Sequence, residues 1–155
     1  MKKAMMGLLF AVTLLACGAA GAEPFDDDPA AAQRDPDFAN GKKAIETKDW
    51  TGAIKFLNSA ALRDTKNADI QNYLGYAHRN AGQMDLAFRH SEHALKLNPR
   101  HRSAHEYVGE AYLMVNNLAK AEEHLAALQK ICLIPFEEYD DLRKEIAKYR
   151  KKAGN

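Results

Sequence analysis

Apolar and small side chains recur along this chain with the three- and four-residue spacing of amphipathic helices. In the stretch 74–99, two such segments are joined at Gly82, and the second ends at Asn98-Pro99 because proline cannot continue a helix. A single pair of short helices cannot bury its own apolar face. The pattern therefore predicts that the helix pair recurs in the chain.

The helix pair recurs with a period of 34 residues. This shift aligns three glycines and three alanines, which are Gly41, Gly75 and Gly109, and Ala53, Ala87 and Ala121. Other positions in register are Trp50, Met84 and Leu118, then Asn40, Leu74 and Val108, then Ala60, Ala94 and Leu128. We expect each glycine to face the alanine of its own unit, because a larger side chain there would separate the two helices.

Turn and cap signals divide the chain into seven predicted helices, at 36–47, 50–63, 68–81, 84–97, 102–115, 118–131 and 136–152. Turns within the pairs are expected at Lys48-Asp49, Gly82 and Asn116-Asn117. The last helix has one apolar face, formed by Phe136, Tyr139, Leu142, Ile146 and Tyr149. We expect it to cover the last repeat and to turn its polar face to solvent, as the end of a stacked-repeat protein requires.

A period of 34 residues, with Gly at the eighth and Ala at the twentieth position, resembles the tetratricopeptide repeat over about 34–135. The resemblance implies an all-α solenoid of three helix pairs, at 35–67, 68–101 and 102–134, with a capping helix at 135–155. Asp37, Gln71 and His105 stand where the family usually has tryptophan. The packing residues that the resemblance implies are Gly41, Ala53, Ala60, Leu74, Gly75, Ala87, Ala94, Pro99, Gly109, Tyr112 and Ala121.

The resemblance also implies a peptide-binding groove on the concave surface, lined by the first helix of each repeat. By register its positions are Asp35, Phe38, Lys42, Ile45 and Glu46, then Asp69, Asn72, Tyr76, Arg79 and Asn80, then Ser103, Glu106, Glu110, Leu113 and Met114. The residues expected to contact a partner are Lys42, Ile45, Asn72, Tyr76, Arg79, Asn80, Glu106, Glu110 and Leu113, with Asn72, Tyr76 and Arg79 central. Alternatively, Phe38, Ile45, Leu113 and Met114 are covered by the leader, the last helix or a second copy of the chain.

The residues before the first repeat have the features of an export signal. Lys2-Lys3, an apolar run over 4–16 and Ala20-Gly21-Ala22 predict a signal peptide at 1–22, and the run is shorter than the roughly 20 residues of a membrane span. Leu14-Leu15-Ala16-Cys17 also resembles a lipobox, in which 1–16 would be removed and Cys17 lipidated. The acidic segment 23–34 is predicted to be a disordered leader. We expect an exported, periplasmic protein of a Gram-negative bacterium, or alternatively an outer-membrane lipoprotein.

Charge and cysteine content narrow the possible partners. Without Lys2 and Lys3 the chain has 20 basic and 21 acidic residues, which argues against a nucleic-acid partner. Cys17 is removed or lipidated, so the single remaining thiol, Cys132, cannot close an internal disulfide. Its neighbours Ile131 and Leu133 are apolar, which favours a structural thiol over a reactive one, with intermolecular pairing as the alternative.

Histidines are the candidate metal ligands of this chain. His90 and His93, and likewise His101 and His105, have helical spacing, but neither pair has an evident third ligand. His78 and His105 occupy positions where the repeat packs an aromatic ring, and the equivalent His90 and His124 are expected to face solvent.

The sequence contains no phosphate-binding loop and no nucleophile elbow, so we expect no enzyme, no metal and no cofactor. The first hypothesis is a non-enzymatic adaptor or scaffold of the cell envelope that binds a protein or peptide partner, with homo-oligomers possible. The first alternative is a lipid-anchored protein of an envelope assembly complex, at the membrane only if Cys17 is lipidated. The second is a metal- or redox-linked accessory protein that uses His90, His93 or Cys132.

Overall fold

The computed structural model describes residues 35–131 and 136–154, whose regular elements are all helices. They are α2 (Pro36–Glu46), α3 (Trp50–Arg63), α4 (Ala68–Asn80), α5 (Met84–Leu97), α6 (Arg102–Met114), α7 (Leu118–Ile131) and α8 (Glu137–Ala153). Each helix begins and ends within one residue of its predicted bounds. The predicted signal peptide, the leader, Cys17 and Cys132 lie outside the described residues.

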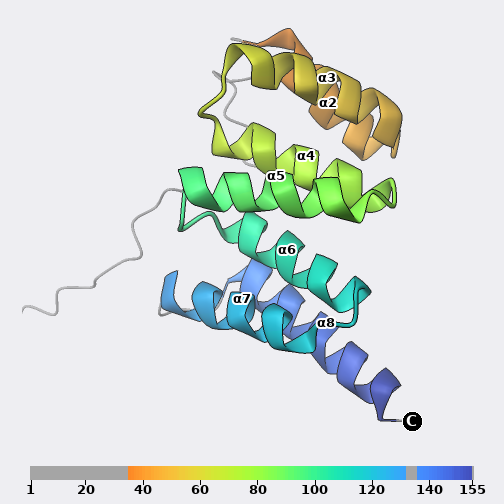
Figure 1. The fold of residues 1–155 in the computed structure, drawn as a ribbon, viewed down its shortest axis with the longest axis vertical. Coiled ribbons are helices and arrows are strands. Elements are labelled where there is room, and N and C mark those ends of the chain that lie inside the picture. Colours follow the sequence, from red (N-terminus) through yellow and green to blue (C-terminus); the bar gives the residue numbers. More distant parts are fainter. Residues whose placement is uncertain (1–34, 132–135, 155) are drawn as a thin grey trace, which may run out of the picture.

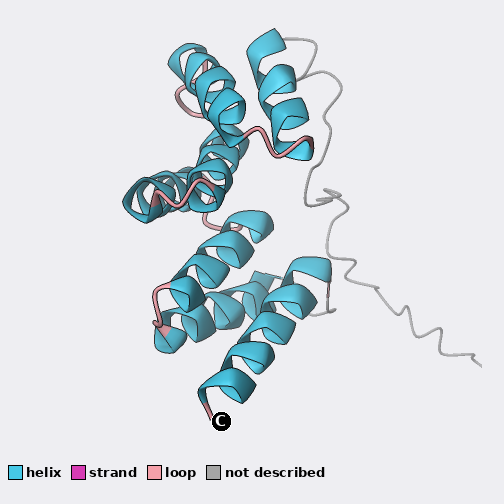
Figure 2. Ribbon diagram, turned by 90° about the vertical axis from the view of Figure 1, so that its right-hand side faces the viewer, coloured by secondary structure: helices cyan, strands magenta, loops and turns pink. Residues whose placement is uncertain are grey.

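The helices form three antiparallel pairs, α2–α3, α4–α5 and α6–α7, stacked along the long axis of the molecule (Figure 1). Each first helix packs on the second helix of its own pair, and α4 and α6 also pack on the second helix of the preceding pair. The last helix, α8, packs on both α6 and α7 at the end of the stack (Figure 2). The predicted all-α solenoid with a capping helix is therefore confirmed.

Local signals set the helix ends. The Asp35 carboxylate accepts hydrogen bonds from the backbone N–H groups at the start of α2, and the Asn67 side chain does the same for α4. Between the helices of each pair, one residue adopts the left-handed conformation, namely Lys48 (φ 57°), Gly82 (φ 75°) and Asn116 (φ 59°). These three residues are 34 apart, so the repeat extends to backbone conformation even where the residue is not glycine.

The recurring spacing of small residues is explained by close helix packing, with one difference from expectation. The alanines and leucine predicted to pack, Ala53, Ala60, Leu74, Ala87, Ala94 and Ala121, are all buried. A Cβ on Gly41 would lie 2.6 Å from Leu57 Cγ, and one on Gly75 would meet Ser91 Oγ and, at 3.2 Å, the Ala87 carbonyl oxygen. Gly41 and Gly75 thus face the residue 16 positions later more closely than the expected alanine side chain.

The third glycine faces the capping helix. A Cβ on Gly109 would lie 2.6 Å from Leu142 Cδ2, so α6 has room for Leu142 of α8 only because this position has no side chain. Leu142 and Ile146 are buried in a cluster with Ala121 and Leu128 of α7. The apolar face of α8 therefore continues the core of the last repeat.

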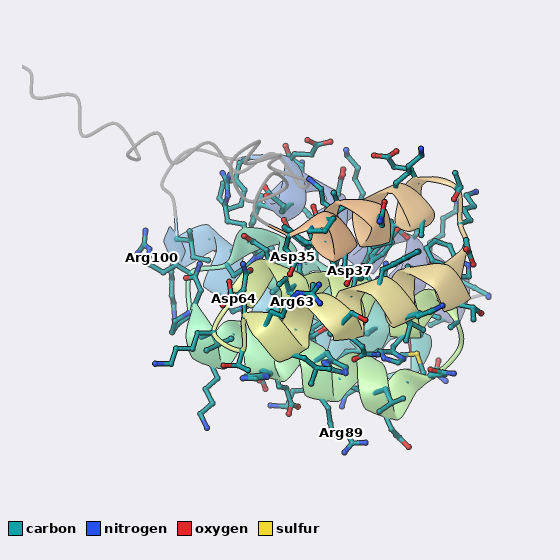
Figure 3. All side chains as sticks on the ribbon, turned by 90° about the horizontal axis from the view of Figure 1, so that it is seen from above. Asp35, Asp37, Arg63, Asp64, Arg89 and Arg100 are labelled. Carbon is teal, nitrogen blue, oxygen red and sulfur yellow. The ribbon has the colours of Figure 1, made fainter. Side chains whose placement is uncertain are left out.

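An exposed ion-pair cluster joins the first helix pair at its open end. Arg63, at the end of α3, donates from Nε to Asp35 (2.9 Å) and from Nη2 to Asp37 (2.6 Å) at the start of α2 (Figure 3). The hydrogen bond from Arg63 holds the pKa of Asp35 below its usual value. The hydrogen bonds that Asp35 accepts from the backbone N–H groups of Asp37 and Phe38 also lower this pKa. The cluster fixes the N-cap carboxylate in its capping position.

Candidate partner-binding site

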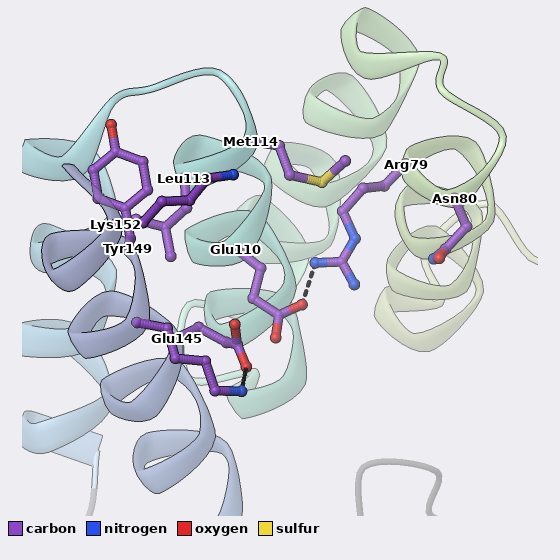
Figure 4. Close-up of a pocket in the computed structure, with 9 residues that line it drawn as sticks. Arg79, Asn80, Glu110, Leu113, Met114, Glu145, Tyr149 and Lys152 are labelled. Carbon is purple, nitrogen blue, oxygen red and sulfur yellow. Dashed lines mark hydrogen bonds and ion pairs between the residues drawn. The ribbon is translucent and has the colours of Figure 1, made fainter. Parts of the chain in front are cut away.

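A cleft of about 530 Å³ lies between the C-terminal ends of α4 and α6 and the C-terminal half of α8 (Figure 4). Its lining residues are Arg79, Asn80, Glu110, Leu113, Met114, Glu145, Lys148, Tyr149 and Lys152. Four of these were expected to contact a partner, namely Arg79, Asn80, Glu110 and Leu113, and Met114 is in the same register set. The structure thus brings together the C-terminal part of the predicted groove.

The four lining residues of α8 were not predicted. The sequence predicted only a capping role for α8, because a helix with one apolar face is what the end of a repeat stack requires. Its polar residues Glu145 and Lys148 are paired (2.5 Å) beside the cleft, and Lys152 lies at the rim (Figure 4). The basic end of the helix was attributed to the helix dipole. No periodic signal distinguishes a polar residue facing solvent from one facing a cleft.

Arg79 is held by the protein itself. Its guanidinium lies over the rings of Tyr76 (5.2 Å) and Tyr107 (5.5 Å) and is ion-paired with Glu110, and its side chain is only 10% exposed. The same group donates to the Tyr107 carbonyl oxygen (3.3 Å). Tyr76 also packs against Trp50 (6.0 Å between ring centroids). The expected role of Arg79 as a partner-binding cation is therefore narrowed to one of fixing the wall of the cleft.

The centre of the predicted groove is closed by packing. Asn72, expected to be central, is 2% exposed, Glu106 is 8% exposed and Ile45 is buried. Phe38 is also buried, against Tyr73 (5.6 Å between centroids), and Lys42 Nζ lies over the Phe38 ring. The four buried side chains are therefore not accessible in the way the register predicted, whereas Lys42 is partly exposed.

Leu113 and Met114 differ in what covers them. Leu113 packs against the cluster of Leu142 and Ile146, so the capping helix covers it in part, as the alternative interpretation proposed. Met114 is 60% exposed at the edge of the cleft. An exposed methionine beside charged groups gives the cleft an apolar contact point for another molecule.

Two carboxyl groups are buried where α6 meets α8. Burial, and then the charges of Glu110, Glu138 and Asp141, raise the pKa of Glu106 to about 8. Glu138 is 1% exposed, and burial raises its pKa as well. Arg102 Nε lies 3.5 Å from Glu138 Oε1. Within the described residues, Glu106 Oε2 and Glu138 Oε1 are buried without a hydrogen-bond partner.

Four histidines, His78, His90, His105 and His124, lie between helices, and the expectation that His90 and His124 face solvent is wrong. The His90 ring stacks on His78 (5.1 Å between centroids), and its Nδ1 lies 2.9 Å from Gln71 Oε1. The Nδ1 atoms of His124 and His105 are 3.0 Å apart. Burial lowers the pKa of both His90 and His124 to about 4. Polar side chains opposite these positions, such as Gln71, supply the partners that allow burial.

The tautomer of His105 follows from its partners. The Pro99 carbonyl oxygen, 3.1 Å from His105 Nε2, can only accept, so that nitrogen carries the proton. The Nδ1 of the neutral His105 ring then accepts from His124 Nδ1–H. Tyr112 completes this layer, packed between Phe88 (4.6 Å) and His124 (5.7 Å).

No three His, Cys, Asp or Glu side chains in 35–131 and 136–154 are grouped so that they could hold a metal ion. None of the helices in that part of the chain has the length and apolar character needed to cross a membrane.

The sequence matches no protein-family model and no curated protein. The fold is similar to that of the Yersinia enterocolitica type III secretion translocator chaperone SycD, with a TM-score of 0.69 and 17% identity over 82% of this chain and 88% of that chain. SycD in complex with a peptide of the translocator YopD gives 0.64 and 17%, over 76% and 88%. The TPR2B domain of yeast Sti1, in a complex with pHsp70, gives 0.70 and 18%, over 79% and 98%.

These matches agree with the 34-residue register, the paired helices and the packed glycines of this chain. In its described residues the chain has the fold of a tetratricopeptide-repeat domain, with three repeats and a capping helix.

Proposed function

We propose that this protein is a non-enzymatic adaptor that binds a peptide segment of a protein partner in the cleft between α4, α6 and α8. The observation that carries the proposal is the cleft itself, about 530 Å³ in volume, with the exposed Met114 at its edge. SycD and the Sti1 domain, which share the fold, were solved with a peptide of YopD and with pHsp70. These two complexes support a peptide as the class of ligand for this chain.

The chemistry of the cleft favours an apolar anchor held between polar contacts. Met114 and the partly covered Leu113 offer apolar surface, and burying it against a ligand contributes roughly 25 cal/mol per Å². Lys148 and Lys152 on one side and Asn80 on the other can hydrogen-bond a peptide backbone or side chain. Such a site takes its affinity from one or two anchors and its orientation from the rim.

The site test compares two exposed apolar residues. A photo-crosslinking amino acid at position 114 should capture a partner segment that the same group at position 62 does not, because Leu62 lies away from the cleft and is 83% exposed. The captured segment, made as a peptide, is then titrated by fluorescence anisotropy. Met114→Ser should weaken binding at least about tenfold, and Leu62→Ser should leave it unchanged.

Equal binding by wild type and Met114→Ser would overturn the cleft as the site. Equal loss in both variants would show that the peptide binds through general surface apolarity instead.

We further propose that the adaptor acts in the bacterial envelope, on the basis of the export signal in the sequence. The free periplasmic form and the lipid-anchored form make different mature chains, beginning at Glu23 and at a lipidated Cys17 respectively. The intact mass of the mature protein distinguishes them, and retention of the 1–22 segment would contradict both.

A further inference from the structure

The cleft depends on the docking of α8. This helix supplies Glu145, Lys148, Tyr149 and Lys152 to the lining, and the other lining residues come from α4 and α6. Leu142, placed over Gly109, and the buried Ile146 hold α8 against the last repeat. If α8 moved away from α6, the cleft would lose one of its walls.

The same helix interface contains buried acids with few counter-charges. Glu106 is faced by Glu110 on its own helix, by Asp141 and Glu138 on α8, and by Arg79 on α4. Arg79 is already ion-paired with Glu110. The acids around Glu106 therefore outnumber the cations that can neutralise them.

Glu138 has one cation close to it, and two other charged or titratable groups act more weakly on its pKa. Arg102, at the start of α6, lies 3.5 Å away, and Glu137 and His101 act from further off. The other element packed on α8, α7, pairs its Glu122 with Arg150 (2.6 Å) near the far end of the helix. Since Glu106 Oε2 and Glu138 Oε1 are buried without a hydrogen-bond partner, a negative charge on Glu106 is poorly compensated and one on Glu138 is compensated only in part, by Arg102.

We propose that α8 is a proton-controlled cap, which lies on α6 while Glu106 and Glu138 hold protons and loosens when both are charged, opening the cleft. Its consequence for ligands rests on the proposed function, but the movement of α8 does not. The charge of Glu138 disfavours a charge on Glu106, and each carboxyl regains water when α8 separates from α6.

The direction of the pH dependence follows from Glu106. Its pKa is about 8 when α8 is docked and 4.5 when the carboxyl is in water. A raised carboxyl pKa means that the docked state binds the proton more tightly, so docking is strongest at low pH and weakens as pH rises from 4.5 to 8. Each unit of pKa difference allows a tenfold change in the docking equilibrium.

Hydrogen exchange of the full mature chain, read by mass spectrometry and corrected for intrinsic rates, tests the cap without a ligand. Between pH 5 and pH 8 the protection of 137–153 should fall at least about tenfold relative to that of 50–63, a helix without His, Asp or Glu. Glu106→Gln and Glu138→Gln should each reduce this fall. Glu137→Gln, which removes an exposed acid in the same turn of α8 that acts on Glu138 only weakly, should reduce it much less.

Two outcomes would overturn the cap. One is that the protection of 137–153 changes with pH in parallel with the rest of the chain. The other is that both buried-acid variants show the pH dependence of wild type. The exchange experiment contains no partner, so its result does not depend on whether the protein binds a peptide. The peptide titration is carried out at a single pH, so its result does not depend on whether α8 moves with pH.

Discussion

His90 is expected to make the folded protein sensitive to acid. Its ring lies between α4 and α5, stacked on His78 and hydrogen-bonded to Gln71. Burial, followed by the nearby His78, lowers its pKa from 6.5 to about 4. The unfolded chain therefore binds a proton that the folded chain disfavours, and stability is lost as pH falls from 6.5 toward 4.

The two pKa values give the size of the effect. At pH 5 the unfolded chain is almost fully protonated at His90 and the folded chain is mostly not, which lowers the free energy of unfolding by about 2 kcal/mol relative to pH 7. His124, whose pKa is also lowered to about 4, adds a loss of the same order between α6 and α7. Glu106 acts in the opposite direction over part of this range.

Urea unfolding followed by far-UV circular dichroism at pH 5 and pH 7 measures the effect in wild type, His90→Gln and His93→Gln. In His90→Gln the fall in unfolding free energy between the two pH values should be smaller by about 2 kcal/mol. His93 is exposed one turn further along α5 and acts on His90 only after burial and His78, so His93→Gln should keep most of the wild-type dependence. Comparing pH dependences cancels the lost ring stacking and the shared Glu106 contribution.

The reasoning is refuted if wild type and His90→Gln lose equal free energy between pH 7 and pH 5. It is also refuted if His93→Gln removes as much of the loss as His90→Gln does, since the effect would then not depend on burial.

Two further predictions concern the backbone and the helix contacts, and urea unfolding at pH 7 measures both. Gly75→Ala should destabilise the protein by about 2 kcal/mol, because the new methyl group meets Ser91 and the Ala87 carbonyl oxygen of α5. The control Ala81→Gly, at the exposed end of α4, should destabilise it by less than half of this. Lys48→Gly should stabilise the protein by about 1 kcal/mol, because glycine adopts the left-handed conformation without the strain of a Cβ. Gly82→Ala should destabilise the protein for the same reason, and a change of stability in the same direction in both variants would contradict the argument.

The sequence was sufficient for the fold because each signal is local or periodic. Asp35 caps a helix whose first residue is proline, Gly82 forms a turn, and Pro99 follows the end of a helix, so the bounds could be placed to within one residue. The period of 34 then indicated which helices pair. These features depend on neighbours in sequence or on the same position in the next repeat.

The site was harder to predict because exposure depends on contacts between repeats. Register placed Asn72 and Glu106 on the concave face, but the helices there approach closely enough to bury both. His90 was predicted to face solvent, but its ring stacks on the ring of His78 from the neighbouring helix. Lys152 was missed because only the docking of α8 brings it to the cleft. None of these facts has a signature within one helix.

The stacking of the helices also determines how far a local disturbance can spread. Among the described helices, contacts join only elements that are next to each other or one pair apart, and none links α2–α3 directly with α6–α8. Such an array is nearly one-dimensional, so its two ends can unfold by separate openings and with different free energies. A lesion in the first pair would reach the cleft only through α4, whereas a bound peptide would stabilise the C-terminal half first.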